Sequence, residues 1–170
     1  MTMTKNLVLV VMVVCVLAAC KKEKPKDVVL NAKPTTQVAA NNMPALTITQ
    51  ADGKQINMKE QTGKVLLVCY NPGCDHCQRE AKLLSDNKDV LSGYEVFFLT
   101  PESLEESDKF QKEYKLTDPN IHFGRSEVTQ IIPALGAITT VPTFFVYKNQ
   151  TLVKRLEGEI SITQLRTAMQ

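Results

Sequence analysis

The apolar residues of this chain fall into short runs that are separated by polar residues, glycine and proline. Two continuous runs, 64–70 (KVLLVCY) and 94–100 (YEVFFLT), have the length of a strand and show no regular alternation with polar positions. Such runs are typical of strands that are buried on both faces, as in the centre of a sheet covered by helices. We therefore expect these two segments to be central strands.

Helical spacing follows each of these strands. The apolar face of the first helix has members at steps of four, three and seven: Cys77, Ala81, Leu84 and Leu91. The polar segment 85–87 is expected to interrupt this helix. Ser103 and Glu106 then form a capping box, which predicts a second helix over about 104–114.

Two hairpins lie on either side of these elements. Residues 45–58 (ALTITQADGKQINM) predict a short hairpin around an Asp-Gly turn, and residues 140–158 predict a longer one around a Lys-Asn-Gln turn. A further short strand is expected at 120–123 (NIHF).

Two more helices complete the pattern. One is expected over 126–135, where Pro133 must end or kink it. Ser161 and Gln164 form a second capping box and open the closing helix. After the first hairpin the order is therefore β-α-β-α-β-α-β-β-α. This order predicts an α/β fold with parallel pairing through right-handed crossovers early and an antiparallel edge from the late hairpin.

The amino-terminal segment has the pattern of an export signal. Lys5 precedes an apolar run at 7–20 that is shorter than the ~18 residues a membrane-spanning helix needs. Its ending, LAAC at 17–20, resembles the lipobox of bacterial lipoproteins, whose signal is cut before a cysteine that carries lipid. The resemblance implies a signal peptide over 1–19 and a lipid on Cys20. A plain signal peptide or a short anchor helix is the alternative.

A tether and one domain are expected after this signal. Residues 20–43 are rich in Lys, Pro, Asn and Ala, and a coil of this length spans roughly 25–30 Å. Residues 44–170 are long enough for one domain with its own core. The chain has 20 Lys and Arg against 18 Asp and Glu, and its short basic segment 21–26 is expected to flank the anchor. No nucleic-acid partner is expected.

The cysteine count favours a working dithiol. Of the five cysteines, Cys15 lies in the signal and Cys20 is the anchor, which leaves Cys69, Cys74 and Cys77. A disulfide framework would require an even and larger number. One close pair with one cysteine left over fits a redox-active dithiol better than a framework of structural disulfides.

The pair Cys74 and Cys77 lies where a buried strand ends and a helix begins. The first turn of a helix has N–H groups without partners and a partial positive charge, which would stabilise a thiolate on Cys74. Cys77 lies one turn further and is expected to be more buried, as the resolving thiol. Between them, a protonated His76 would add positive charge and Asp75 would oppose it.

Two other interpretations of the pair fit the sequence less well. A zinc site normally needs four ligands, and outside the pair the chain offers only Cys69 and His122 as soft ligands. Cys69, in a predicted core strand, is better explained as a small buried hydrophobe, and His122 as a strand or surface residue. A purely structural disulfide across so short a loop would gain little chain entropy.

The motif and its surroundings resemble a known family. A strand followed by CDHC at a helix start, with TVPT before a late strand, is similar to the thioredoxin fold, a three-layer arrangement of a mixed sheet between helices. More narrowly, LTITQADGKQINMKEQTGKVLLVCYNPGCDHCQRE resembles the membrane-tethered TlpA/ResA-like thiol-disulfide oxidoreductases, which have an N-terminal hairpin and a C-X-X-C-X-X-E site. The resemblance covers about residues 45–170.

The resemblance implies roles for three further residues. Pro142 matches the cis-proline whose loop packs against the disulfide and helps to bind the substrate backbone, and Val141 before it would contact substrate. Glu80 matches the acid that tunes thiol titration in this branch. Its alternative interpretation is an exposed acid in the first turns of a helix, where negative charge is favourable anyway.

Three positions depart from the family pattern. Gly73 stands where a tryptophan or similar residue usually precedes the first cysteine. Val68 stands where thioredoxin has a buried aspartate that assists proton transfer, which puts thioredoxin-like kinetics in doubt. His76 is similar to the histidine of oxidising members, but Asp75 replaces the proline before it.

The resemblance implies an enzyme of the bacterial cell envelope. It would exchange disulfides with exported client proteins as a lipid-anchored monomer, without a cofactor, and as a reductase it would take electrons from a membrane thiol protein. Cytochrome c maturation, antioxidant defence and general disulfide repair are the possible settings. Two alternatives remain. One is a peroxiredoxin-like peroxidase, a family that has Thr at the position of Asn71. The other is a Sco-like copper or haem chaperone, in which three residues separate the two cysteines, whereas two separate them here.

Overall fold

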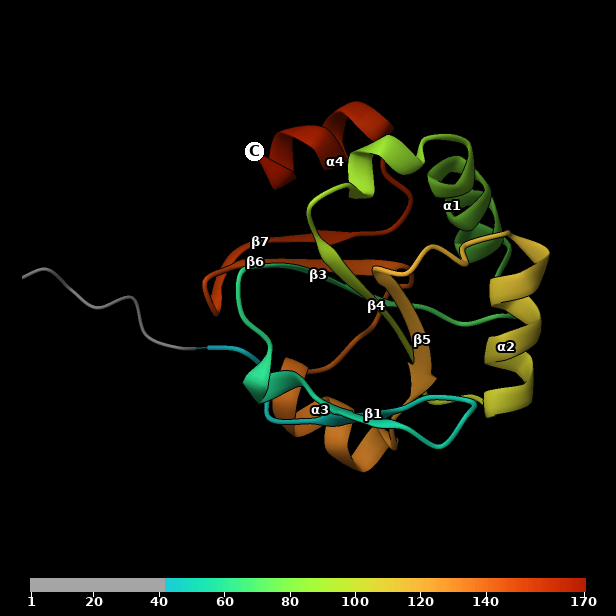
Figure 1. Ribbon diagram of the computed structural model, residues 1–170, viewed down its shortest axis with the longest axis vertical. Helices are drawn as coiled ribbons and strands as arrows, with labels where there is room; N and C mark the ends of the chain where they lie inside the picture. Colours follow the sequence, from blue (N-terminus) through green and yellow to red (C-terminus); the bar gives the residue numbers. More distant parts are fainter. Residues whose placement is uncertain (1–41) are drawn as a thin grey trace, which may run out of the picture. The chain divides into compact units, whose positions relative to one another are not determined.

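A mixed β-sheet forms the centre of the protein (Figure 1). The computed structural model describes residues 42–170. Within this part, seven strands pair in the order β2-β1-β5-β4-β3-β6-β7. Their bounds are β1 Thr47–Thr49, β2 Gln55–Asn57, β3 Lys64–Cys69, β4 Glu95–Thr100, β5 Ile121–Arg125, β6 Thr143–Lys148 and β7 Thr151–Glu157.

The pairing directions agree with the predicted topology. β3 pairs with β4, and β4 with β5, in parallel. β6 pairs antiparallel with β3, and β7 pairs antiparallel with β6, so the late hairpin supplies one edge of the sheet. The first hairpin, β1 and β2, supplies the other edge through an antiparallel contact between β1 and β5. β3 therefore lies near the middle and carries the cysteine motif at its carboxyl end.

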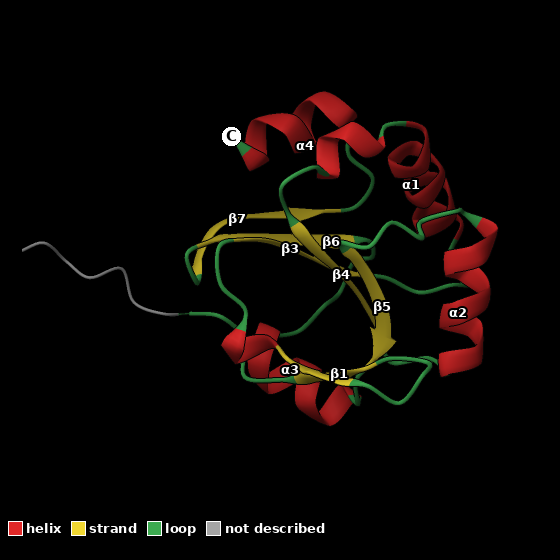
Figure 2. Ribbon diagram, in the orientation of Figure 1, coloured by secondary structure: helices red, strands yellow, loops and turns green. Residues whose placement is uncertain are grey.

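Helices cover both faces of the sheet, as Figure 2 shows. Their bounds are α1 Asp75–Asp86, α2 Leu104–Glu113, α3 Val128–Leu135 and α4 Ile162–Met169, with short 3-10 helices at Met58–Glu60 and Lys88–Leu91. One core cluster packs α1, α2 and α4 against the sheet, and a second packs α3 and the first hairpin against the opposite face.

The two clusters explain why the central strands are apolar throughout. Along β3, Leu66 and Val68 belong to the first cluster, whereas Val65 and Leu67 belong to the second. Since successive side chains of a strand point to opposite faces, a strand covered on both sides needs apolar residues at every position. The expected α/β three-layer fold with an N-terminal hairpin is confirmed.

The local helix signals are also confirmed. α1 ends at Asp86, where the polar segment was expected to interrupt it, and Asn87 caps it by donating from its side chain to the Leu83 carbonyl at 2.9 Å. Both predicted capping boxes form, at the start of α2 and of α4. Pro133 lies inside α3, which ends two residues later at Leu135.

The packed part of the chain begins slightly before the expected boundary at residue 44. Met43 is 1% exposed within the second core cluster. The Asn42 N–H donates to the Gln150 carbonyl at 3.1 Å. The predicted signal peptide over 1–19, the lipid on Cys20 and nearly all of the tether lie outside the described residues. Within residues 42–170, no helix is long and apolar enough to cross a membrane.

Candidate active site

The two cysteines lie at the start of α1, directly after the loop that follows β3. Cys74 is the N-cap residue of α1 and is partly exposed, whereas Cys77 is 2% exposed. Both are free thiols, so the structure shows the dithiol form. The first turn of α1 presents its unpaired N–H groups and partial positive charge at Cys74. This arrangement fits the expected attacking role of Cys74 and resolving role of Cys77.

Asn71 holds the loop that presents Cys74. Its side-chain oxygen accepts from the Gly73 N–H at 2.8 Å, and its side-chain nitrogen donates to Glu102 at 2.9 Å. Its carbonyl accepts from the Cys74 N–H at 3.1 Å. Its own N–H donates to the Cys77 sulfur at 3.5 Å. Through these hydrogen bonds, Asn71 connects the β3–α1 loop to the β4–α2 connection and to both cysteines.

The environment of Cys77 keeps its thiol protonated. Burial raises the pKa of Cys77 to about 12, against the opposing effect of the hydrogen bond from the Asn71 N–H. Negative charge on Cys74 and on Glu80 raises the pKa of Cys77 further. A thiol held protonated in this way needs a proton acceptor before it can act as a nucleophile.

Glu80 is a buried acid beneath the pair. Its side chain is on α1 and the residue is 3% exposed, so the alternative of an exposed helix acid was wrong. One carboxyl oxygen accepts from the Ile160 N–H at 3.1 Å, and the other is buried without a hydrogen-bond partner. Burial raises the pKa of Glu80 from 4.5 to about 7. A carboxyl group of this kind can gain or lose a proton near neutral pH.

A charged cluster lies on the exposed side of α1. Asp75 is exposed as the first residue of the helix, and the His76 side chain is exposed one residue later. The Nδ1 atom of His76 lies 2.6 Å from the Glu159 Oε1 atom, and the Arg79 Nε atom donates to the same oxygen at 2.8 Å. Sequence analysis missed Arg79 and Glu159, because a glutamate 80 residues away carries no local signal.

The residue expected to be the cis-proline is in the cis form. The Val141–Pro142 peptide bond is cis and directly precedes β6. Val141 is partly buried and packs against the core cluster that contains Cys77 and that Cys74 also contacts. The Pro142 carbonyl accepts from the Gly158 N–H at 2.8 Å. The structure therefore brings the Val141–Pro142 loop and the cysteine pair to the same end of the sheet.

An apolar groove of about 290 Å³ adjoins the Val141 side of the site. Val128 and Ile132 of α3, which line it, are 49% and 50% exposed. Its other lining residues are Cys69, Tyr70, Asn71, Leu99, Pro101, Ile131, Ala137, Ile138 and Val141. The groove therefore joins the loop that presents Cys74 to an exposed apolar face of α3.

Three other residues that the sequence singles out, Val68, Cys69 and His122, lie on strands of the sheet. Cys69 is buried among the second core cluster, and burial raises its pKa to about 12, as expected for a small core residue. His122 is on β5, where it pairs with Glu95 at 2.9 Å and stacks on Phe97. Val68 packs in the same cluster as Cys77. The buried carboxyl group near the site is on α1 instead of β3.

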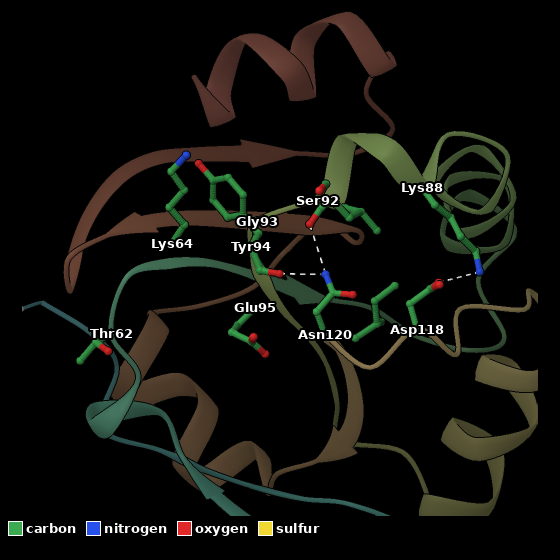
Figure 3. A pocket seen from close by; sticks show the side chains of 11 residues that line it. Thr62, Lys64, Lys88, Ser92, Gly93, Tyr94, Glu95, Asp118 and Asn120 are labelled. Atoms are coloured by element: carbon green, nitrogen blue, oxygen red, sulfur yellow. Dashed lines mark hydrogen bonds and ion pairs between the residues drawn. The ribbon is translucent and has the colours of Figure 1, made fainter.

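A larger hollow of about 410 Å³ lies at the other end of the sheet, where β3 and β4 begin (Figure 3). Its charged and polar groups bond to neighbours: Lys88 pairs with Asp118 at 2.6 Å, and Asn120 donates to the Tyr94 carbonyl at 2.9 Å. Among residues 42–170, no group of three or more His, Cys, Asp and Glu side chains is placed to hold a metal ion.

Known structures share this arrangement of strands and helices. One is a secreted Mycobacterium tuberculosis disulfide oxidoreductase homologous to E. coli DsbE, at 15% identity and a TM-score of 0.63, covering 74% of this chain and 94% of that one. Another is StoA from Bacillus subtilis, at 18% identity and a TM-score of 0.59, covering 76% and 99%. A third is the thioredoxin domain of a thiol-disulfide oxidoreductase from Bacteroides vulgatus, at 17% identity and a TM-score of 0.57, covering 75% and 94%.

Sequence comparison gives the family. No curated protein matches the chain. The family model of the AhpC/TSA family matches residues 25–155, which is most of the chain. The structural neighbours share the thioredoxin-like fold that the sequence predicts. The chain belongs to the AhpC/TSA family, as a member with a thioredoxin-like fold and a Cys74-X-X-Cys77 pair at the start of its first helix.

Proposed function

We propose that the protein is an exported disulfide reductase that exchanges its Cys74–Cys77 dithiol with disulfides of other exported proteins. The observation that carries this proposal is the pairing of a partly exposed Cys74 at a helix N-terminus with a buried Cys77 one turn below it. An exposed thiol can reach the disulfide of a large client, whereas a buried one can react only after the first sulfur bond has formed.

The reaction proceeds in two exchanges. The Cys74 thiolate attacks one sulfur of the client disulfide, a mixed disulfide forms, and the first client sulfur leaves as a thiolate and takes up a proton. Cys77 then loses its proton and attacks the Cys74 sulfur, which releases the second client thiol. Two electrons and two protons pass to the client, and the protein is left with a Cys74–Cys77 disulfide.

Glu80 serves as the proton acceptor for the second exchange. Its pKa of about 7 and its buried oxygen without a hydrogen-bond partner suit a group that takes a proton from a thiol in the interior. Val141 and Pro142 bind the client backbone beside the mixed disulfide. Their position at the same end of the sheet as the cysteine pair supports this role.

The cell envelope is the proposed setting. The amino-terminal signal and the lipid on Cys20 would hold the domain at a bacterial membrane as a monomer, and a membrane thiol protein would return electrons to the Cys74–Cys77 disulfide. The secreted disulfide oxidoreductase among the structural neighbours supports an exported location, since it has the same fold.

The test is the reduction potential of the pair in the purified protein. The protein is equilibrated in glutathione and dithiothreitol buffers, and free thiols are counted by the mass shift on alkylation. A value of about −270 mV supports a reductase, and a value above about −180 mV indicates an oxidant or isomerase instead. The Cys74→Ser variant should lose the reduction of insulin disulfides, and Cys77→Ser should accumulate the mixed disulfide.

The same preparation distinguishes the two alternatives. Rapid oxidation of Cys74 by hydrogen peroxide, with turnover faster than insulin reduction, would favour a thiol peroxidase. Tight Cu(I) binding by the reduced protein, without formation of a Cys74–Cys77 disulfide at any potential, would favour a metal chaperone and reject the reductase.

A further inference from the structure

The connection between β7 and α4 contacts each part of the site. This connection, residues 158–160, is called the β7–α4 link below. Its Gly158 N–H donates to the carbonyl of Pro142. Its Glu159 carboxylate pairs with His76 and Arg79 on the exposed side of α1. Its Ile160 N–H donates to Glu80, beneath the cysteine pair. Three consecutive residues therefore contact the cis-proline loop, the exposed face of α1 and the buried acid.

The residues on either side of Glu159 restrict the conformation of the β7–α4 link. Gly158 has a φ of 77°, in the left-handed region that residues with a side chain rarely adopt. Ile160 is 8% exposed within the first core cluster, and the next residue, Ser161, caps α4. Glu159 is thus presented to α1 by a backbone that is fixed before and after it.

We infer that Glu159 is a positioning residue that sets the charge beside Cys74, and that the β7–α4 link thereby controls how readily Cys74 forms a thiolate. This inference rests on the proposed thiol-disulfide exchange. Arg79 and His76 lie on the first turns of α1, where the positive charge of Arg79 favours a thiolate. The Glu159 carboxylate binds both side chains and opposes the effect of that charge.

The charge interactions among these groups agree with this role. The Glu159 hydrogen bond is the main cause that raises the pKa of Arg79, and the charge of Cys74 contributes in the same direction. Arg79 and His76 in turn hold the pKa of Glu159 below its ordinary value, so Glu159 is ionised wherever the thiol titrates. Arg79 therefore interacts with both the carboxylate and the cysteine.

Other charged groups also surround Cys74 and must be held constant. Asp75 lies on the same helix turn, and Glu80 lies beneath it. Glu102 bonds to the loop through Asn71. The α2 residues Glu106, Lys109 and Glu113 line a hollow with Pro72 and Gly73. The comparison therefore removes one negative charge at two places and leaves all of these side chains in place. The charge of Glu159 also helps to raise the pKa of Glu80, so its removal lowers that pKa as well.

The matched control is Glu157. It lies two residues before Glu159, its side chain is 47% exposed against 38%, and it pairs with Arg155 at 2.7 Å on its own strand. Glu159→Gln and Glu157→Gln therefore change net charge equally, at similar exposure. Only the first frees Arg79 and His76.

The experiment measures the rate of iodoacetamide alkylation at Cys74 as a function of pH, with the modified peptide identified by mass. We expect Glu159→Gln to move the midpoint to lower pH and to raise the rate below the midpoint about two- to fivefold, the range for exposed ion pairs. Glu157→Gln should match the wild type. Arg79→Gln should slow the reaction, and 1 M salt should reduce the Glu159→Gln effect.

The reduction potential gives a second readout. Above the midpoint, the same stabilisation of the thiolate should make the disulfide of Glu159→Gln more oxidising by about 9 to 21 mV, which is two- to fivefold at 29.6 mV per tenfold. A purely structural ion pair would lower the melting temperature without moving the midpoint, and that result would overturn the inference. Equal shifts in Glu159→Gln and Glu157→Gln would overturn it as well.

The readouts separate this inference from the proposed function. If the wild type forms no Cys74–Cys77 disulfide, the proposed function fails, while the alkylation profiles still report on Glu159. If the disulfide forms and the two glutamine variants behave alike, the inference alone fails.

Discussion

The buried carboxyl group of Glu80 makes a prediction about stability that can be worked from the structure. Its pKa rises from 4.5 to about 7 on folding, chiefly because of burial. The folded protein therefore holds a proton on Glu80 between these pH values, where the unfolded chain has lost it. Stability from this group is fully present below pH 4.5 and is lost as the pH rises to about 7.

The magnitude follows from the interval between the two pKa values. At ~1.36 kcal/mol per pH unit, the interval corresponds to an upper value of about 3 kcal/mol, and partial solvent screening reduces it to about 2–3 kcal/mol. Glu80→Gln has no charge to bury and keeps an oxygen that can accept from the Ile160 N–H. The unfolding free energy of the variant minus that of the wild type should therefore increase by about 2–3 kcal/mol as the pH rises from 4.5 to 8.

The assay is urea unfolding followed by circular dichroism at four pH values from 4.5 to 8, with reductant present so that both proteins stay in the dithiol form. Glu113→Gln, an exposed acid on α2, is the control and should stay within about 0.5 kcal/mol of the wild type at each pH. A difference between Glu80→Gln and the wild type that does not change with pH would refute the reasoning. The same variant should slow the second exchange, which single-turnover insulin reduction would show as accumulated mixed disulfide.

Three further predictions follow from the packing. Cys69→Ala should keep the rate of insulin reduction within twofold of the wild type, because Cys69 packs in the core on the face opposite Cys77. The variant should lose about 1 kcal/mol of unfolding free energy in urea. Loss of insulin reduction would instead show that Cys69 takes part in the redox reaction. Gly124→Ala should cost about 1–3 kcal/mol, because a Cβ atom there would lie 2.5 Å from the Thr49 carbonyl oxygen, and an unchanged melting temperature would contradict the β1–β5 contact. Ser103→Ala should cost about 1 kcal/mol in thermal unfolding by removing the cap on the Glu106 N–H, whereas Ser103→Asp should retain most of the stability.

Much of the fold could be predicted because its signals are local. The apolar run at 64–70 predicts a strand covered on both faces, and two capping boxes predict where helices begin. The order of elements then restricts the topology, since parallel strands need right-handed crossovers. The position of Cys74 and Cys77 at a helix start follows from the same reasoning, because the strand and the helix that meet there are both visible in the pattern.

Strand order across the sheet required the tertiary structure. The first hairpin joins β5, and β6 returns to pair with β3, through contacts between segments far apart in the chain. Periodicity shows which face of a strand is apolar, but it does not show which strand lies beside it. The burial of Met43 is a similar case, because it depends on a core that the rest of the domain builds.

For the site, the sequence by itself determined the reacting pair and, through resemblance, the residues to examine around it. Only the tertiary structure decided that Glu80 is buried and that Glu159 faces His76 and Arg79. Both residues contact across the β7–α4 link: Ile160 donates to Glu80, and Glu159 accepts from Arg79, about 80 residues apart along the chain. Burial and charge act through distance in space, and a sequence pattern records only distance along the chain.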